Sequence, residues 1–366
     1  MDTTISVDLD ELSAFCAKSL TDVAGRDTMG IISMPVPIAP LETFLSAASK
    51  TMSLMWHSPA GHAIAASGAA ARIDVHGASR LTQLREQADA LFASMTPYAF
   101  PGWEGPRARI FGGLAFAVGE KTDAPWEEFG DGCFTLPRWT YSKSQEGASL
   151  TLATRGTDDT GLTWRDGVMN ELEGIFEALQ FSRGRASIAP PGVSIPRDHV
   201  RQSSFAQWQS HIGKIHEAIE SGGFEKIVAA RRCEVDLVKP LSDLDVLARL
   251  IWETRCVRFY FRRERTAFLG ASPETLFAKT GLQLTSEALA GTIRSFGSDI
   301  PRLEGQSSRL MNSDKDLSEH GYVVREIRNS LAPLSAEVTM HEKPEIRKIR
   351  NILHLNTRLS AALLPS

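Results

Sequence analysis

Apolar residues recur at helical spacing near the amino terminus and predict a helix over residues 8–24. The residues expected on its buried face are Leu9, Leu12, Phe15, Cys16 and Leu20. Short β-like runs punctuated by glycine and proline follow, and another helix is expected over 163–182. The predicted strands are Met29–Pro35, Ser53–His57, Ile64–Val75, Arg109–Val118, Gly132–Tyr141 and Ala148–Thr154. This half favours a mainly antiparallel sheet with a few helices, and Gly112-Gly113 indicates a bulge or a close backbone approach.

The second half of the chain has a more regular pattern. Its predicted helices are 203–221, 241–253 and 313–333, and its predicted strands are 225–238, 256–262, 266–271, 275–279, 282–288, 335–341 and 350–359. Between the halves, the segment Ala186–Arg197 carries three prolines and a glycine, which oppose any regular element. We therefore expect one domain at 1–185, a linker at 186–197 and a second domain at 198–366.

The predicted helix 313–333 carries polar residues at one end of its apolar stripe. At about 100° per residue its apolar side chains gather on one face. They are Leu317, Val323, Val324, Ile327 and Leu331. Asp316 and His320 fall at the amino-terminal end of that face, and Glu319 falls at its edge. Inward carboxylates are costly unless a cation, a metal or a donor meets them, so this end is either a polar rim satisfied by Arg or Lys, or a metal or substrate site.

Composition narrows the class of protein. The chain has 366 residues, of which 42% are apolar and 23% charged, and these values argue against disorder and coiled coil. Its formal net charge of −4 gives no electrostatic reason to expect nucleic acid or an anionic membrane as a partner. The acidic start lacks the features of a signal peptide, and no apolar stretch reaches the length of a membrane span. A cytoplasmic protein is therefore expected.

The usual catalytic and metal-binding motifs are absent from the sequence. It contains no CxxC pair, GxxxxGK[ST], strand-linked GxGxxG, HExxH or GxSxG. Nucleotide-cofactor and serine-hydrolase functions therefore have no support.

Three short segments carry residues suited to chemistry. Lys226 opens the apolar run KIVAA and is expected at the mouth of a buried strand, as a solvated strand end or, if desolvated, as a base. The small residues and proline of GASPE favour a turn that projects the carboxylate of Glu274. In EALAGT, Gly291 and Thr292 offer a backbone N–H and a hydroxyl suited to gripping a substrate carboxylate. Either of these last two segments is also compatible with an ordinary turn.

The order and spacing of these segments, together with SDKDLSEH at 313–320, resemble those of the chorismate-utilising enzymes, most closely the isochorismate synthases. The resemblance is specific over about 225–360. It includes IRNILHLNTRL at 349–359, which is similar to the family's strand with a histidine and a threonine, here His354 and Thr357. The resemblance implies a fold that mixes helices and strands, α/β in the broad sense and α+β in the narrower one. In this fold two mostly antiparallel sheets pack together with helices outside.

The resemblance also implies a Mg²⁺-dependent active site for chorismate. By position, Lys226 would activate water for attack at C2 of the ring, and Glu274 would protonate the departing C4 hydroxyl. Glu319 would bind the Mg²⁺ that bridges to the substrate carboxylate. The residues that would bind the substrate are Ala290, Gly291, Thr292, His354 and Thr357. The residue types suit this chemistry. Hydroxide is a poor leaving group, so an acid must protonate it, and Mg²⁺ prefers carboxylate oxygens as ligands.

The residue at position 290 distinguishes members of this family that catalyse different reactions. Relatives that make aminodeoxychorismate tend to carry a nucleophilic lysine there, whereas Ala290 leaves room for water or ammonia. Anthranilate synthases also lack that lysine, but they typically carry a tryptophan-binding LLES-type motif, which this sequence does not have. Water addition by an isomerase, an isochorismate synthase, is therefore the expected activity. The alternative enzyme is a sibling that goes on to eliminate pyruvate and release salicylate.

The sequence departs from the family in its last part. The family continues past the His/Thr strand with a second Mg²⁺-binding glutamate and an arginine for the substrate carboxylate, whereas this sequence ends at Ser366. We therefore expect weak Mg²⁺ binding, and impaired stability unless a second chain supplies the missing segment. A catalytically incomplete, non-enzymatic subunit is the remaining hypothesis, which the presence of Lys226, Glu274 and Glu319 opposes. These residues do not specify whether the product serves menaquinone, siderophore or salicylate synthesis.

Overall fold

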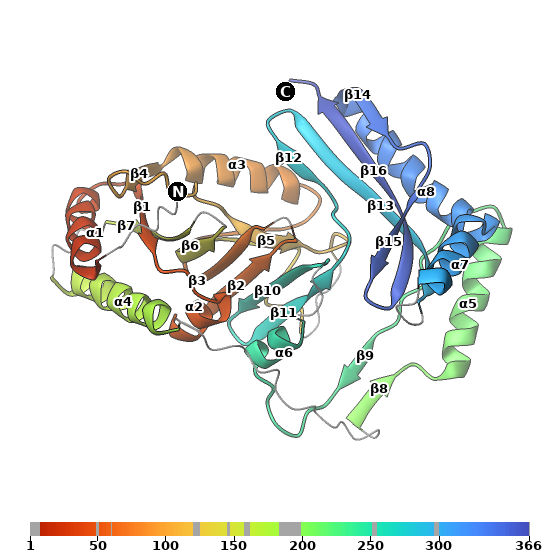
Figure 1. The fold of residues 1–366 in the computed structure, drawn as a ribbon, viewed down its shortest axis with the longest axis horizontal. Helices are drawn as coiled ribbons and strands as arrows, with labels where there is room; N and C mark the ends of the chain where they lie inside the picture. The colour runs from red at the N-terminus through yellow and green to blue at the C-terminus, as the bar shows by residue number, and fades with distance from the viewer. Residues whose placement is uncertain are drawn as a thin grey trace. The chain divides into compact units, whose positions relative to one another are not determined.

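The computed structural model describes residues 8–48, 51–59, 61–119, 125–144, 147–156, 162–182, 199–250, 255–295 and 300–365 (Figure 1). The chain divides into two compact units. The first unit comprises Met1–Ala189 and Val246–Ala271, and the second comprises Pro190–Asp245 and Ser272–Ser366.

A nine-stranded sheet forms the centre of the first unit. Its strands are β1 (Met29–Val36), β2 (Met52–His57), β3 (Ala63–Val75), β4 (Met95–Ala99), β5 (Phe111–Leu114), β6 (Gly132–Lys143), β7 (Ala148–Arg155), β10 (Val257–Arg263) and β11 (Thr266–Ser272). Their order is β11-β10-β2-β3-β6-β7-β1-β4, with β5 paired to β6. The β1–β4 pair is parallel, whereas β1–β7, β2–β3, β3–β6 and β6–β7 are antiparallel. The mainly antiparallel sheet expected from the sequence is confirmed.

The helices of the first unit follow the predicted pattern only in part. They are α1 (Leu9–Val23), α2 (Leu41–Ala47), α3 (Arg80–Ala93) and α4 (Leu162–Phe181). The predicted helices at 8–24 and 163–182 correspond to α1 and α4. Asp8 caps α1, because its carboxylate accepts a hydrogen bond from the backbone N–H of Asp10 at 3.2 Å. α3 was not predicted, and its burial explains why, since Leu91 is the one buried residue along it.

Around Gly112 the structure matches one expectation and corrects another. The predicted strand Arg109–Val118 forms a strand only over β5. The close backbone approach is confirmed, because a Cβ on Gly112 would lie 2.0 Å from the carbonyl oxygen of Cys133 on β6. No side chain larger than hydrogen fits at that position without movement of the backbone.

Strand β10 places part of the predicted second domain in the first unit. It pairs antiparallel with β2, from Arg258 opposite His57 to Arg263 opposite Met52. β2 obtains backbone hydrogen-bond partners from β10 that would otherwise be missing on that edge. The division into 1–185 and 198–366 is therefore wrong for residues 246–271. The predicted linker 186–197 lies outside the described residues.

The second unit is built on a five-stranded antiparallel sheet. Its strands are β12 (Ala278–Thr280), β13 (Gln283–Arg294), β14 (Ser335–Met340), β15 (Glu345–Ile349) and β16 (Ile352–Leu363). The order is β12-β13-β16-β14, and β15 also pairs with β16. The predicted strands 282–288, 335–341 and 350–359 are confirmed, although β13 runs further, to Arg294, and β15 was not predicted.

Two helices, α7 (Ile300–Met311) and α8 (Asp314–Leu331), pack against one face of this sheet, and η3 (Ala332–Leu334) follows α8. Leu317 of α8 contacts the buried cluster of Leu310 on α7 with Leu353 and Leu355 on β16. Further along α8, Ile327 packs against a second buried cluster that includes Leu331. Ser313 caps the helix by accepting a hydrogen bond from the Asp316 N–H at 3.3 Å. The predicted helix 313–333 and its apolar face are therefore confirmed.

The segment that carries Lys226 differs from the prediction. It follows α5 (Phe205–Glu220), and the predicted strand 225–238 exists only as β9 (Cys233–Val235), which pairs with β8 (Val200–Gln202). Residues 225–232 have no regular secondary structure, and Val228 is 77% exposed. A strand needs a neighbour to take its backbone hydrogen bonds, and no strand in the described parts of the chain pairs with 225–232. The placement of Lys226 at the mouth of a buried strand is therefore wrong.

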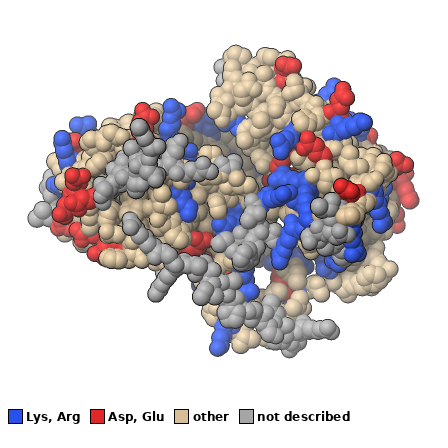
Figure 2. Space-filling model, viewed as in Figure 1, with Lys and Arg blue, Asp and Glu red and all other residues tan. Residues whose placement is uncertain are grey.

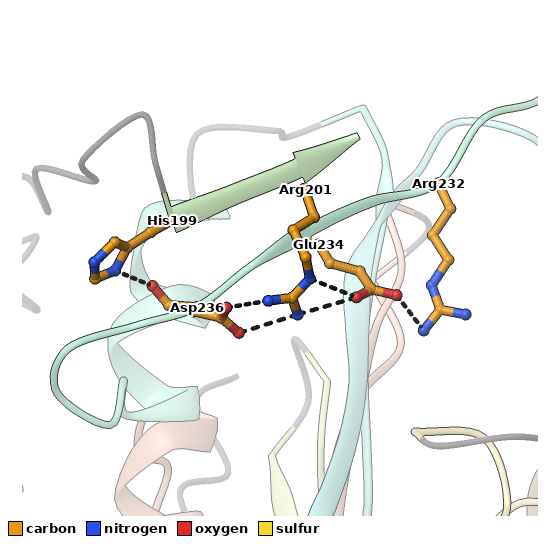
Figure 3. Close-up of polar contacts among 5 residues, drawn as sticks. All are labelled: His199, Arg201, Arg232, Glu234 and Asp236. Carbon is orange, nitrogen blue, oxygen red and sulfur yellow. Dashed lines mark hydrogen bonds and ion pairs between the residues drawn. The ribbon is translucent and has the colours of Figure 1, made fainter. Parts of the chain in front are cut away.

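Charged side chains join β8 to β9 (Figure 3). Arg201 donates to Glu234 Oε2 at 3.1 Å from Nη2 and also pairs with Asp236. Arg232 Nη2 lies 2.6 Å from Glu234 Oε1, and His199 Nδ1 contacts the Asp236 carbonyl oxygen at 3.0 Å. These side chains are largely exposed, so the ion pairs favour the β8–β9 register more than they stabilise the fold.

The surface carries charges of both signs, as the face in Figure 2 shows. α6 (Asp243–Arg249) is shorter than the predicted helix 241–253, whose residues 251–253 lie outside the described ranges. Among the described helices, none has the length and apolar character needed to cross a membrane.

Candidate active site

The neighbouring strands β13 and β16 carry the residues predicted to bind substrate. Successive side chains of a strand point to opposite faces of its sheet. Leu353, Leu355 and Thr357 of β16 therefore share the face covered by α7 and α8. His354 lies on the opposite face, which we call the polar face and which also carries Glu287 of β13 and Arg347 of β15.

Gly291 interrupts the alternation on β13. Ala290 lies opposite Leu355 and Thr292 lies opposite His354, so the pairing skips Gly291 at a β-bulge. Gly291 has φ +77°, in the left-handed region that glycine adopts without cost. A Cβ at this position would also lie 3.1 Å from Leu355 Cδ1 and 3.3 Å from Asp316 Cβ. The bulge therefore turns Thr292 to the polar face, beside His354.

Thr292 and His354 form a hydrogen-bonded pair on the polar face. Thr292 Oγ1 lies 2.8 Å from His354 Nδ1. Burial lowers the pKa of the His354 imidazole, and the positive charge of Arg347, which is opposite His354 on β15, lowers it further. A hydrogen bond with the backbone of Gly291 raises the pKa of His354 and so opposes these two effects. The structure thus brings together three of the predicted substrate-binding residues, Gly291, Thr292 and His354, and their contact with substrate stays a prediction.

Thr357 lies on the other side of the sheet, away from that group. Its Oγ1 is 2.8 Å from Nε2 of His320 on α8, and each side chain is 3% exposed. Burial is the main cause that lowers the pKa of His320, and the backbone of Ala290 opposes it. The structure therefore pairs Thr357 with a buried histidine of α8. The helical pattern had placed His320 on the inward face, but it did not identify this partner.

The predicted acid, Glu274, lies in an irregular segment between β11 and β12, whereas the turn expected at GASPE does not form, because residues 270–272 belong to β11. Its side chain keeps contact with solvent, but surrounding atoms partly desolvate the carboxyl and raise its pKa. The negative charge of Glu287 raises the pKa of Glu274 further, and the positive charge of Lys226 opposes both effects. A raised pKa keeps a carboxyl protonated to higher pH, which suits a proton donor.

Lys226 interacts with this carboxyl through its charge. That charge lowers the pKa of Glu274, although residues 225–232 form no strand. The preceding residue, Glu225, pairs with Arg325 on the outer side of α8 at 3.0 Å and ties the segment to the helix. Lys226 is half-buried, and its ammonium makes no hydrogen bond or ion pair within the described ranges. A lysine in such a position is free to meet a substrate.

Two residues beside the candidate acid were not assigned a role from the sequence. Glu287 Oε2 pairs with Arg347 Nη1 at 2.7 Å, and Glu287 Oε1 accepts a hydrogen bond from the backbone N–H of Thr275 at 3.1 Å. A carboxylate within the otherwise small and apolar stretch EALAG was the available signal. Nothing in the sequence pattern pointed to its cation, which comes from another strand.

Glu319 of α8 is the predicted magnesium ligand. Its carboxylate is half-buried and has no hydrogen bond or ion pair among the residues that the structure describes. Those residues contain no group of three or more His, Cys, Asp or Glu side chains that could hold a metal ion. Mg²⁺ commonly binds through one or two carboxylates together with substrate oxygens and water. Glu319 therefore fits an ion shared with a substrate rather than one enclosed by protein ligands.

Residues 18–366 match the family described as chorismate binding enzyme. The chain is 31% identical over 238 residues to isochorismate synthase MenF of Pasteurella multocida, and the match covers 64% of this chain and 52% of the relative. It is 29% identical over 336 residues to the salicylate biosynthesis isochorismate synthase of Pseudomonas aeruginosa, covering 89% and 66% of the two chains. The chain thus spans between half and two thirds of the length of these relatives.

Solved structures show the same fold. The menaquinone-specific isochorismate synthase MenF of Escherichia coli superposes with a TM-score of 0.65 at 19% identity, covering 96% of this chain and 76% of that one. Anthranilate synthase component I of Streptococcus pneumoniae gives a TM-score of 0.60 at 13% identity, covering 85% and 71%. The fold class predicted from the sequence is confirmed by these matches, and the family by the match over 18–366. The chain belongs to the family of chorismate-binding enzymes.

Proposed function

We propose that the protein is an isochorismate synthase, an isomerase that adds water at C2 of chorismate and releases the hydroxyl of C4. The observation that carries this proposal is the charge interaction between Lys226 and Glu274, a candidate base and a candidate acid. The relatives named as isochorismate synthases support the same reaction.

Glu274 supplies the proton in this reaction. The C4–O bond breaks as the departing oxygen takes the proton of the Glu274 carboxyl and leaves as water. The raised pKa of Glu274 favours the protonated form needed for this step. The glutamate regains a proton from solvent, to which its side chain is accessible.

Lys226 removes a proton from the water that attacks C2. The new C–O bond forms as the ring double bonds shift toward C4, so one water enters and one leaves. Lys226 can act as a base only in its neutral form, and it meets the water because no partner in the described ranges holds its amine. Ala290, which is half-buried on β13, supplies no competing nucleophile.

The polar face would hold the substrate carboxylate. Gly291 and Thr292 contribute a backbone N–H and a hydroxyl, and His354 orients that hydroxyl through the 2.8 Å contact. Glu319 would hold Mg²⁺, which when bound neutralises carboxylate charge. Magnesium dependence, a cytoplasmic location and a second chain as partner stay predictions.

A salicylate-forming reaction is the second candidate. The match to a Pseudomonas aeruginosa relative named as a salicylate biosynthesis isochorismate synthase covers 89% of this chain; the name connects that relative to salicylate synthesis, but the activity it states is the first candidate's. Chromatography of the products formed from chorismate separates the two candidates. Isochorismate without salicylate supports the first candidate, and salicylate with pyruvate supports the second.

The catalytic pair is tested by two substitutions. Lys226→Ala and Glu274→Gln should each abolish turnover while the unfolding transition in urea stays close to that of the wild type, because both side chains contact solvent. Lys214→Ala on α5 is the matched control for the lysine and should keep full activity. Near-normal turnover in either site variant would contradict the assignment of acid and base.

A further inference from the structure

Glu287 makes two contacts next to the candidate acid, and they use both oxygens of its carboxylate. Oε1 accepts the N–H of Thr275, the residue directly after Glu274, at 3.1 Å. Oε2 pairs with Arg347 at 2.7 Å. The side chains of Glu287 and Arg347 are 13% and 23% exposed, so the pair is largely shielded from solvent. Solvent and salt screen a charged pair in such a place less than they screen a surface salt bridge.

These contacts link three separate segments of the second unit. Glu287 lies on β13, Arg347 on β15 and Thr275 in the irregular segment after β11. The irregular segment has no strand to fix it, so the hydrogen bond from Thr275 gives it a fixed point on the sheet. Because Glu274 and Thr275 are neighbours in the chain, fixing one restricts where the carboxyl of the other lies.

We propose that Glu287, held by Arg347, is a positioning residue for the acid Glu274. It anchors the backbone of the segment that carries Glu274, and its negative charge faces the acid. Both of its carboxylate oxygens contact protein groups, and the role we assign to it is exerted through Glu274. This inference rests on the proposed function for its catalytic consequence, but its structural part does not.

The groups that act on Glu274 define the expected electrostatic effect. Glu287 faces it from β13 and raises its pKa, and Lys226 faces it from the segment before β9 and lowers it. Behind Glu287 stand Arg347 of β15 and the exposed Arg358, which is opposite Glu287 on β16. Removing the charge of Glu287 should therefore lower the pKa of Glu274.

Glu287→Gln separates the charge from the anchor. Glutamine keeps an oxygen that can accept the Thr275 N–H, but it carries no negative charge. The protonation of Glu274 is followed by ¹³C NMR of the side-chain carboxyl carbons, with Glu274→Gln identifying its signal. We expect the titration of Glu274 to move to lower pH in Glu287→Gln and to stay unchanged in Glu345→Gln, a control on β15 that pairs with His341.

Glu287→Ala removes both the negative charge and the hydrogen bond to the Thr275 N–H. The loss of positioning should lower kcat by about 10²-fold with little change in KM, since a positioning residue acts on the acid and not on substrate binding. Glu287→Gln should retain more activity than Glu287→Ala, because it keeps the hydrogen bond to Thr275. Urea unfolding of each variant shows that the protein tested is folded.

An unchanged Glu274 titration in folded Glu287→Gln would overturn the electrostatic part of the proposal. Equal kcat in wild type and Glu287→Ala would overturn the positioning part. The NMR measurement needs no turnover, so it remains decisive if the wild type makes no isochorismate. In that case the proposed function would fail while the effect of Glu287 on Glu274 could still be confirmed.

Discussion

His320 of α8 and Thr357 of β16 meet at 2.8 Å between Nε2 and Oγ1, inside the interior of the second unit. The contact joins the helix that carries Glu319 to the strand that carries His354. Buried polar groups stabilise a structure only when they are paired, so this hydrogen bond fixes the helix on the sheet as well as contributing to stability.

Thr357→Val should therefore destabilise the protein. Valine has a similar shape but cannot bond to His320, so the Nε2 atom stays buried without a partner. We expect the free energy of unfolding to fall by about 1–3 kcal/mol, measured by urea denaturation. Thr339→Val on β14 is the control, because Thr339 is exposed and should give no comparable change. Equal losses in the two variants would contradict a special role for Thr357.

The same histidine should make stability depend on pH. Burial holds the pKa of His320 below its ordinary value, so the unfolded chain takes up a proton at higher pH than the folded chain does. Protonation therefore stabilises the unfolded state relative to the folded state as pH falls through about 6.5. The free energy of unfolding accordingly rises with pH over this range. His320→Gln removes this contribution.

The measurement compares the free energy of unfolding of His320→Gln and wild type at about pH 5.5 and about pH 7.5. We expect the variant to lose more stability relative to wild type at the higher pH, where the wild-type imidazole is neutral in both states. A difference that is the same at the two pH values would contradict a lowered pKa for His320.

Gly291→Ala should disturb both the fold and the binding of substrate. Alanine would be strained at φ +77° and would press on Leu355 and Asp316, which lie 3.1 and 3.3 Å from its Cβ. Gly281→Ala is the matched control, because Gly281 also has a positive φ, +58°, but has nothing within 4 Å of its Cβ. We expect both variants to lose stability from strain, and Gly291→Ala to lose more.

KM for chorismate provides a second readout of the same pair. It should rise in Gly291→Ala, since the bulge aims Thr292 at His354, and it should stay at the wild-type value in Gly281→Ala. If the two variants behaved alike in stability and in KM, the bulge would have no role in the site.

Local patterns predicted those parts of the site that depend on one element. α8 was found because its apolar residues repeat at helical spacing, and the same projection placed His320 inward and Glu319 at the edge. The bulge at Gly291 was not predicted, and it reverses which face Thr292 occupies. The alternation of side chains along β16 likewise places His354 and Thr357 on opposite faces of the sheet. Their common sequence motif does not reveal this separation.

Contacts between distant segments account for what the sequence did not show. Residues 225–232 have the composition of a strand, but a strand requires a partner, and none lies beside them in the described ranges. α3 buries little of its surface, so its sequence shows a weak apolar stripe. Glu287 and Arg347 are 60 residues apart, and only the fold brings them together.

Glu319→Gln should weaken magnesium binding. Because one carboxylate of this chain fits the ion, Mg²⁺ should bind weakly by itself and more tightly when chorismate supplies further oxygen ligands. Calorimetric titrations with and without chorismate measure both affinities. Glu326→Gln, an exposed carboxylate on α8, should leave them unchanged. Tight Mg²⁺ binding by Glu319→Gln would contradict Glu319 as the ligand.

The central claim is that this chain converts chorismate to isochorismate. The most direct test is a chromatographic assay of purified residues 1–366 with chorismate, with and without Mg²⁺. We predict isochorismate that forms only when Mg²⁺ is present and that disappears in Lys226→Ala. A folded protein that leaves chorismate unchanged under these conditions would contradict the claim, and it would favour a non-catalytic subunit of an isochorismate synthase.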